Sequence, residues 1–197
     1  VLNPKFVSKI PLNLNSYIKL LNADGGSSGI QIKPFAVPGK VALWLEDSSK
    51  GSNFGSVDED TIALEIISEE TNKRFFYIPA CAHVPDWLKE KLDNTDLLFF
   101  DGTLWTDDEM IKQKVGIKTG KRMGHISMSG KEGSLEVLKN INIKRKIFIH
   151  INTTNPALLD NSSERELLTN QGWEVSFDTM EIELSLIHIS EPTRRRG

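Results

Sequence analysis

Two short apolar runs dominate the hydrophobic pattern of the chain. Residues 97–100 and 147–149 are uninterrupted apolar, and they lie within strands that we predict at 96–100 and 146–149. A strand that is apolar on both faces is typical of the buried centre of a parallel sheet. The pattern therefore predicts at least two buried, parallel strands in the second half of the chain.

Other strands follow from composition and alternation. Residues 61–67 and 74–78 are rich in β-branched and aromatic side chains around a polar turn at 69–73, which predicts a hairpin. Residues 41–46 are predicted as a further strand. Residues 173–184 alternate between apolar and polar side chains, which predicts a terminal strand or hairpin.

Helices are predicted between these strands, at residues 86–92, 107–114, 132–140 and 163–171. The first follows Pro85, a residue that helix starts tolerate, and places Trp87, Leu88 and Leu92 on one side. The last is followed by Gly172, at the position of a C-cap glycine. Because strands and helices alternate along the chain, the predicted fold class is α/β.

The two ends of the chain differ from this pattern. Residues 1–39 are irregular, and the Asn, Gly and Ser residues at 22–29 predict a loop. The chain begins at Val1 without a methionine, so we expect the natural start to lie upstream. Residues 185–197 read as a translated sequencing adapter, so we expect them not to belong to the natural fold. Without that segment, whose net charge is +2, the chain's charge of −3 becomes −5.

Composition excludes several classes of protein. Of the 197 residues, 39% are apolar and 26% are charged, and the net charge is −3. A negative net charge argues against binding to nucleic-acid phosphates. No apolar run approaches the roughly 20 residues that span a bilayer, and a single cysteine, Cys81, excludes internal disulfides. We therefore expect a cytoplasmic protein that acts neither on nucleic acid nor in a membrane.

Both buried strands end in a side chain that can bind a metal or move a proton. The first runs directly into Asp101 and the second into His150. α/β sheets bind ligands at the carboxyl ends of their strands, and Gly102 allows a sharp turn there. The alternatives stay open: Asp101 also suits an Asp-Gly turn, and a lone His150 suits a hydrogen-bonded position in the core.

Other candidate residues are weaker from the sequence alone. His125 lies in a glycine-flanked loop, where turn and capping roles compete with chemistry. Cys81 and His83 have the spacing of a metal-binding pair, but two ligands without a third are weak evidence. Lys118, Lys121 and Arg122 are typical of a solvated loop, and binding of an anionic substrate is the alternative.

Three motifs nevertheless resemble a known family. In chain order they are Phe100-Asp101-Gly-Thr103, Gly124-His125-Ile-Ser127 and Phe148-Ile-His150. They resemble the late motifs of the metallo-β-lactamase superfamily, in the branch of the transfer-RNA-maturing endonucleases. The finer pattern, with Trp105 and residues 122–125 and 150–156, is similar to the B proteins of pyrroloquinoline quinone (PQQ) biosynthesis. The similarity extends over most of residues 41–184.

The resemblance implies a fold and a set of roles. Residues 1–184 would form the C-terminal part of a metallo-β-lactamase-like αββα sandwich, whose histidine-rich metal loop lies upstream. We therefore expect an apolar sheet face, poor solubility and little activity of this chain alone. His150 matches the last metal ligand, and Asp101 and His125 match an acid–histidine pair for proton transfer. Arg122, Asn152 and Asn155 are the candidates for substrate binding, although the two amides also suit backbone contacts.

The resemblance also implies a function for the complete protein. Hydrolytic relatives carry a metal-bridging aspartate after the strand that here reads Phe76-Tyr-Ile-Pro-Ala80, and no acid follows here. This favours a single metal, Fe(II) or otherwise Zn, over a two-metal hydrolase. The family implies an O₂-dependent hydroxylase of the tyrosine ring in a glutamate–tyrosine precursor of PQQ, with a homodimer as a further expectation. The alternatives are a carrier of finished PQQ and a hydrolase of the same fold.

Overall fold

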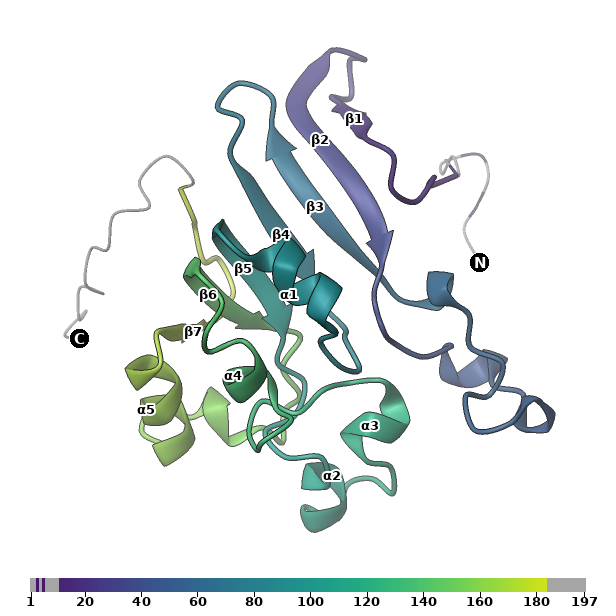
Figure 1. Ribbon diagram of the computed structural model, residues 1–197, viewed down its shortest axis with the longest axis vertical. Coiled ribbons are helices and arrows are strands. Elements are labelled where there is room, and N and C mark those ends of the chain that lie inside the picture. The colour runs from purple at the N-terminus through teal and green to yellow at the C-terminus, as the bar shows by residue number, and fades with distance from the viewer. Residues whose placement is uncertain (1–2, 4, 6–10, 184–197) are drawn as a thin grey trace.

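The computed structural model describes residues 3, 5 and 11–183, and its centre is one seven-stranded sheet (Figure 1). The strands lie in chain order, antiparallel from the first to the fourth and parallel from the fourth to the seventh. They are β1 (Ile18–Leu21), β2 (Ser27–Ala36), β3 (Ile62–Ser68), β4 (Arg74–Ile78), β5 (Thr95–Asp101), β6 (Ile143–Ile149) and β7 (Trp173–Val175).

Short helices connect the strands, and the mixture confirms the predicted α/β class. The α-helices are α1 (Asp86–Leu92), α2 (Glu109–Lys112), α3 (Gly120–Met123), α4 (Ser134–Val137) and α5 (Ser163–Asn170). Four 3₁₀ turns, η1 (Leu43–Leu45), η2 (Ser48–Lys50), η3 (Asp58–Asp60) and η4 (Pro156–Leu158), complete the described elements. No helix in this part of the chain is both long and apolar enough to cross a membrane.

One face of the sheet carries the core. Leu88 and Leu92 of α1 are fully buried in the same cluster as Phe76, Phe100 and Phe148 of the strands. In Figure 1, α1 and α4 lie on the face turned to the viewer. Burying each such side chain contributes about 1.5–3 kcal/mol, so this contact fixes the helices on that face. The prediction that Trp87 shares the buried side is wrong, because Trp87 is 47% exposed.

The opposite face is apolar as well. Strand alternation places Leu64, Ile66, Phe75, Tyr77 and Phe99 there, and Phe99 packs edge-on against Phe75 at 5.8 Å. None of these side chains belongs to the cluster that joins the helices to the sheet. Tyr77 is 39% exposed. The face therefore has the character expected from the resemblance, and the low solubility inferred from it stays a prediction.

The parallel strands bring their carboxyl ends to one edge of the sheet. Asp101 of β5 pairs in register with Ile149 of β6, directly before His150. Gly102 allows this close approach: its N–H donates to the Ile149 carbonyl at 2.8 Å, and an added Cβ would lie 2.9 Å from the Cβ of Phe148. The loops after β4, β5 and β6 meet at this edge, below the sheet in Figure 1.

Three segments differ from the sequence prediction. Residues 1–39 are not irregular throughout, because β1 and β2 form there, and β2 pairs with β3 over seven positions. Gly29 and Pro34 within β2 are typical of strand breaks, but this register overrides that signal. The loop predicted at 22–29 is shorter, since β2 begins at Ser27. The terminal strand predicted at 173–184 ends at Val175 within the described residues.

The strand predicted at residues 41–46 is also wrong. The chain leaves the sheet after Val37, whose N–H donates to the Thr61 carbonyl, because Pro38 has no N–H to continue the ladder. Residues 43–45 form the 3₁₀ turn η1, and Trp44 is 84% exposed. The helices predicted at 107–114 and 132–140 exist but are confined to α2 and α4.

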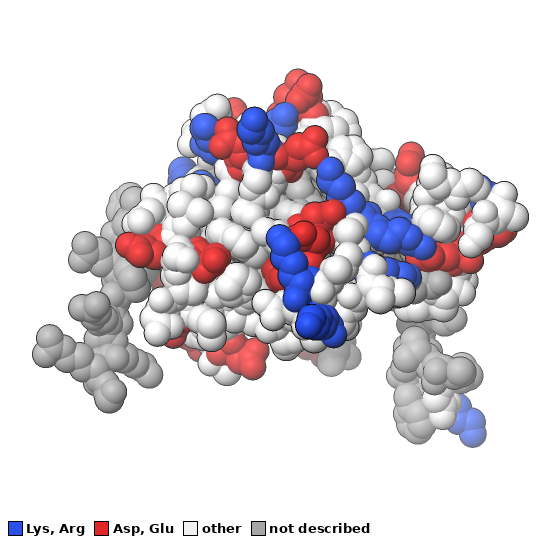
Figure 2. Space-filling view, turned by 90° about the horizontal axis from the view of Figure 1, so that it is seen from below, with Lys and Arg blue, Asp and Glu red and all other residues white. Residues whose placement is uncertain are grey.

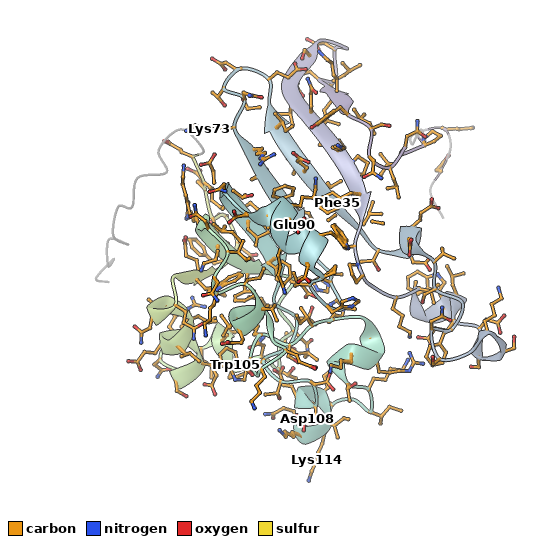
Figure 3. The ribbon with its side chains drawn as sticks, in the orientation of Figure 1. Phe35, Lys73, Glu90, Trp105, Asp108 and Lys114 are labelled. Atoms are coloured by element: carbon orange, nitrogen blue, oxygen red, sulfur yellow. The ribbon has the colours of Figure 1, made fainter. Side chains whose placement is uncertain are left out.

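A buried ion pair joins α1 to the sheet. The Glu65 side chain is 4% exposed, and its carboxylate lies 2.9 Å from Lys91 Nζ and 3.6 Å from an Arg74 nitrogen. Lys91 Nζ also lies 4.8 Å from the ring centroid of Phe35, which stands beside α1 in Figure 3. Because the carboxylate is out of contact with water, it depends on Lys91 for compensation.

We predict that Lys91→Ala lowers the free energy of unfolding by about 2–3 kcal/mol, because it leaves the buried Glu65 carboxylate without its closest partner. Urea unfolding followed by circular dichroism measures this. The matched control is Lys89→Ala on the same helix, whose partner Asp86 is 90% exposed; its expected effect is below about 1 kcal/mol. Equal losses in the two variants would contradict the assigned role of the Lys91–Glu65 pair.

Candidate metal centre

Asp101 is the buried centre of the group at the sheet edge. Its side chain has no solvent exposure, yet it receives hydrogen bonds from three segments. Oδ2 accepts from the Cys81 N–H at 3.0 Å and lies 2.8 Å from His125 Nδ1. Oδ1 accepts from the N–H and the hydroxyl of Thr103, at 3.1 Å and 2.6 Å. Both oxygens are therefore occupied by donors of the chain itself.

Thr103 connects the two histidines, a role that no pattern in the sequence predicted. Its Oγ1 lies 2.8 Å from His150 Nδ1 and 3.1 Å from His125 Nδ1. Because the hydroxyl hydrogen goes to Asp101, the oxygen is free to accept from His150 Nδ1–H. His125 Nδ1–H in turn donates to Asp101. This assignment leaves a lone pair on Nε2 of both rings, the form in which imidazole binds a metal.

His150 is held in an unusual backbone conformation. Its φ of 55° lies in the left-handed region, which side chains other than glycine rarely adopt and which is enriched at functional sites. The side chain is 54% exposed, and its ring stacks on that of His125 with centroids 5.2 Å apart. This strained backbone conformation places the His150 imidazole at the solvent-exposed edge of the sheet.

Asp101, His125 and His150 offer ligand atoms that all lie within 4.8 Å of one another. Two imidazoles and one carboxylate are a donor set that suits iron and zinc. The Asp101 oxygens already accept four hydrogen bonds, so the imidazole nitrogens are the atoms that remain to bind an ion. Asp101 orients the His125 ring directly and the His150 ring through Thr103. The described residues therefore supply part of a coordination sphere.

Glu109 braces the loops around this group. It is buried, accepts from the Trp105 N–H at 2.6 Å and is hydrogen bonded to the Thr154 hydroxyl. Thr154 in turn accepts from the Asn152 amide at 2.6 Å. Figure 3 shows Trp105 among the loops at this end of the sheet. Nothing in the sequence marked Glu109, because its partner lies 45 positions away.

The two candidate amides differ in what they contact. The Asn155 side chain is buried, donates to the Gly102 carbonyl at 3.0 Å and accepts from the Ala157 N–H at 3.0 Å. Substrate binding and backbone contacts were both open for Asn155, and its side chain makes the backbone contacts. Asn152 is half-buried beside His150, with its N–H on the Thr103 carbonyl at 3.0 Å. A substrate role for either residue stays a prediction.

Arg122 has a partner within the chain. Its guanidinium binds both Glu46 oxygens, at 3.0 Å and 2.7 Å, and lies 3.8 Å above the Phe54 ring. Arg122, together with Lys40, holds the pKa of the Glu46 carboxyl at about 2. Lys118 is 3.9 Å from the same carboxylate. A substrate would compete with Glu46 for Arg122, so its proposed binding role stays a prediction.

Cys81 contributes its backbone rather than its thiol. The thiol donates to the His83 carbonyl at 3.0 Å, and burial raises its pKa to about 12. A protonated, buried thiol is a poor metal ligand. His83 is exposed and does not belong to the group of Asp101, His125 and His150. No acidic residue stands between Pro79 and Pro85, the segment where two-metal hydrolases would carry their bridge.

The chain is similar to known proteins over most of its length. The model of the β-lactamase superfamily domain matches residues 2–151. The chain is 47% identical over 185 residues to coenzyme PQQ synthesis protein B of Bradyrhizobium diazoefficiens, covering 93% of this chain and 59% of that protein. It is 45% identical over 182 residues to the protein of the same name in Xanthomonas oryzae pv. oryzae, covering 92% and 58% of the two chains.

A solved structure shares the fold. The crystal structure of Zn²⁺-bound PqqB from Methylobacterium extorquens matches with a TM-score of 0.78 and 42% identity, over 88% of this chain and 55% of that one. The chain thus spans less than two thirds of the length of these relatives. On the match of the family model over residues 2–151, together with these relatives, the chain belongs to the β-lactamase superfamily.

Proposed function

We propose that the whole protein is an enzyme of PQQ biosynthesis that binds one metal ion through His150. The observation that carries this proposal is the hydrogen-bonded series His150–Thr103–Asp101–His125, which leaves Nε2 of both imidazoles free. The names of the relatives supply the pathway, and the zinc bound by the related PqqB supports metal binding by the whole protein.

The reaction that we propose is hydroxylation of a tyrosine ring in a glutamate–tyrosine-derived precursor, with Fe(II), O₂ and a two-electron reductant. One oxygen atom of O₂ enters the ring as a hydroxyl group, and the other leaves as water. A bound ferrous ion supplies the activation of O₂, which the side chains of this chain cannot perform. The absence of an acid between Pro79 and Pro85 favours this one-metal chemistry over hydrolysis between paired ions. A cytoplasmic location and a homodimer belong to the same proposal.

His125 is suited to proton transfer in this reaction. With its Nδ1–H donated to Asp101, its Nε2 is the atom that takes a proton from the phenol hydroxyl of the substrate. The buried Asp101 carboxylate stabilises the imidazolium that results, because opposite charges attract strongly away from water. Thr103 holds the His150 ring in one tautomer while this proton moves. Asp101 and Thr103 therefore position the two histidines, and His125 and His150 contact the reacting groups.

We predict that, in a version extended to the length of the relatives, His150→Ala abolishes tight binding of ferrous iron and of zinc at this site, because it removes the exposed imidazole of the group. Isothermal titration with each metal measures the affinity. His83→Ala is the matched control, an exposed histidine outside the group, and its metal affinity is expected to stay unchanged. In a version extended to the length of the relatives, iron-dependent oxygen uptake and an added oxygen in the product mass are expected to disappear with His150→Ala alone.

Other outcomes separate the alternatives. Oxygen uptake that survives His150→Ala would overturn the role of His150. Tight binding of finished PQQ without any turnover would indicate a carrier. Metal-dependent hydrolysis of a phosphodiester or lactone by the extended protein would indicate a hydrolase.

We predict that Thr103→Val weakens metal binding about 10–100-fold, the usual effect of removing a group that orients a ligand. Valine keeps the shape of the side chain and removes the hydroxyl that His150 Nδ1 contacts. Thr103→Ser restores that hydroxyl and is expected to bind metal nearly as well as threonine. Equal affinities for the valine and serine variants, at equal melting temperatures, would show that the hydroxyl does not position His150.

A further inference from the structure

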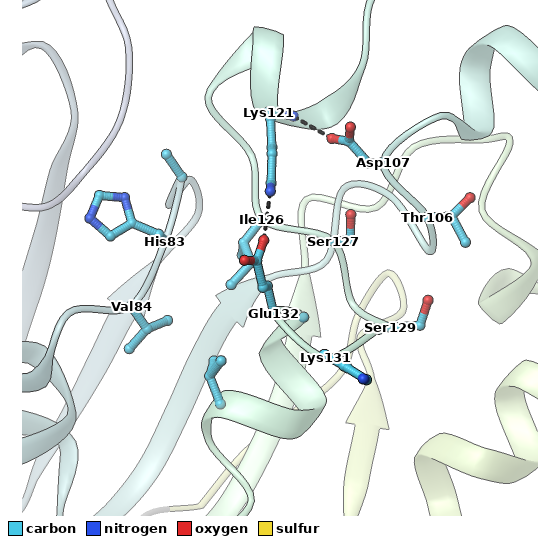
Figure 4. Close-up of a pocket in the computed structure, with 14 residues that line it drawn as sticks. His83, Val84, Thr106, Asp107, Lys121, Ile126, Ser127, Ser129, Lys131 and Glu132 are labelled. Carbon is cyan, nitrogen blue, oxygen red and sulfur yellow. Dashed lines mark hydrogen bonds and ion pairs between the residues drawn. The ribbon is translucent and has the colours of Figure 1, made fainter.

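An open cavity of about 870 Å³ is lined by segments that flank the candidate metal centre, among them residues 82–84 and 126–127. The loops after β4 and β5, the helix α3 and the loop before α4 line it (Figure 4). Val84, Ile126 and Val137 supply an apolar wall. The polar lining comes mainly from residues 127–133, a stretch that none of the proposed roles uses.

The loop before α4 offers a run of unused donors. Gly130, Lys131 and Glu132 line the cavity, and their three backbone N–H groups make no hydrogen bond within the described part of the chain. The neighbouring N–H groups of Ser129 and Gly133 are both bonded, at 3.1 Å and 3.0 Å. Gly130 has a φ of 91°, which turns the loop here. Successive free N–H groups in such a turn form a concave anion-binding site.

Among the described residues around these donors, the Lys131 ammonium is the cation without an ion-pair partner. Lys121 of α3 and Glu132 form an ion pair at 2.6 Å, drawn in Figure 4, so neither is free. Lys131 makes no ion pair or hydrogen bond among the described residues, and neither does the Ser127 hydroxyl. Asp107 adds a second acid to the lining. One free cation beside two carboxylates favours a singly charged anion over a doubly charged one.

The surface around the cavity has mixed charge. Figure 2 looks onto this end of the molecule, and basic side chains lie interleaved with acidic ones there. Such a surface suits a ligand that carries both an amine and a carboxylate better than a polyanion.

Backbone hydrogen bonds link the lining of the cavity to the metal centre, although Asp101, His125 and His150 do not themselves line the cavity. The Ile126 N–H donates to the Cys81 carbonyl at 2.6 Å, and the Cys81 N–H donates to Asp101. Ser127 follows His125 by two residues. A ligand in the cavity therefore lies against the segments that position both members of the Asp101–His125 pair.

From these observations we infer that the cavity binds the carboxylate end of an amino-acid-derived ligand. The N–H groups of residues 130–132 and the Lys131 ammonium receive the carboxylate, and Val84, Ile126 and Val137 contact the hydrocarbon part. The choice of a tyrosine-like ligand rests on the proposed function, whereas the recognition of the carboxylate rests on the loop alone.

The test is a nitrogen-15 NMR titration of the chain with L-tyrosine, with tyramine, which lacks the carboxylate, and with inorganic phosphate. L-tyrosine is expected to shift the amide signals of residues 130–132, while tyramine and phosphate leave them in place. Lys131→Gln is expected to weaken L-tyrosine binding about tenfold, as the loss of one charge-assisted hydrogen bond does. Lys131→Glu is expected to weaken it further. Lys139→Gln, at an exposed lysine that follows the end of α4 and does not line the cavity, is expected to change nothing.

The possible outcomes are distinct. Equal shifts with tyramine, no shift with L-tyrosine, or full affinity in Lys131→Gln would overturn the inference. Shifts caused by phosphate alone would overturn it in favour of a phosphate site. Because the titration needs neither metal nor turnover, its failure beside oxygenation by the extended protein would leave the proposed function intact. Binding of L-tyrosine at this loop without oxygenation by the extended protein would support the inference and overturn the proposed function.

Discussion

The Asp101 carboxylate, sealed from water at the end of β5, determines how the rest of the sheet edge is arranged. Burying an ionised carboxylate costs several kcal/mol unless donors replace its water. Here the donors come from the loop after β4, the loop after β5 and the loop after α3, through Cys81, Thr103 and His125. Because each loop supplies a hydrogen bond that the buried charge requires, the three loops are held in one arrangement.

This arrangement extends to His150 through a single hydroxyl. The Thr103 hydroxyl donates a hydrogen bond to Asp101 and accepts one from His150 Nδ1–H. The buried Asp101 therefore sets the tautomer of the exposed His150 through Thr103. The left-handed backbone at His150 has a cost of its own. Thr103 accepts hydrogen bonds from His150 Nδ1–H and from the Asn152 N–H, and Glu109 and Thr154 brace the following loop; together these contacts offset that cost.

Two basic residues near this edge differ in their partners. Arg122 is held by Glu46, and together with Lys40 and Phe54 it fastens residues 40–56 to α3. Lys131 has no such partner among residues 11–183 and lines a cavity. Under the proposed function, metal chemistry at His150 and recognition of a carboxylate beside it thus fall to different loops. This separation is physically reasonable, because an arginine already neutralised by a carboxylate has little attraction left for a second anion.

Several strands and helices of the fold were predicted from the pattern of apolar and polar side chains. The apolar runs of β5 and β6, the hairpin of β3 and β4 and the helices α1 and α5 carry local signals, since each buries a continuous run or a single stripe of side chains. The placement of Asp101 and His150 at adjacent strand ends followed from the same signals, because parallel strands end at one edge. The motif around His125 pointed to its family role, although no local pattern placed it beside Asp101.

The remaining features depend on partners that are distant in the chain. β2 contains Gly29 and Pro34, and its pairing with β1 and β3 makes it a strand. Arg122 meets Glu46 across 76 positions, Thr103 meets His150 across 47, and Glu109 meets Thr154 across 45. The sequence by itself determined the α/β class, the buried strands and the chemical groups at their ends. Only the tertiary structure decided which of those groups are free for a ligand, because a hydrogen bond between remote residues leaves no periodic trace in the chain.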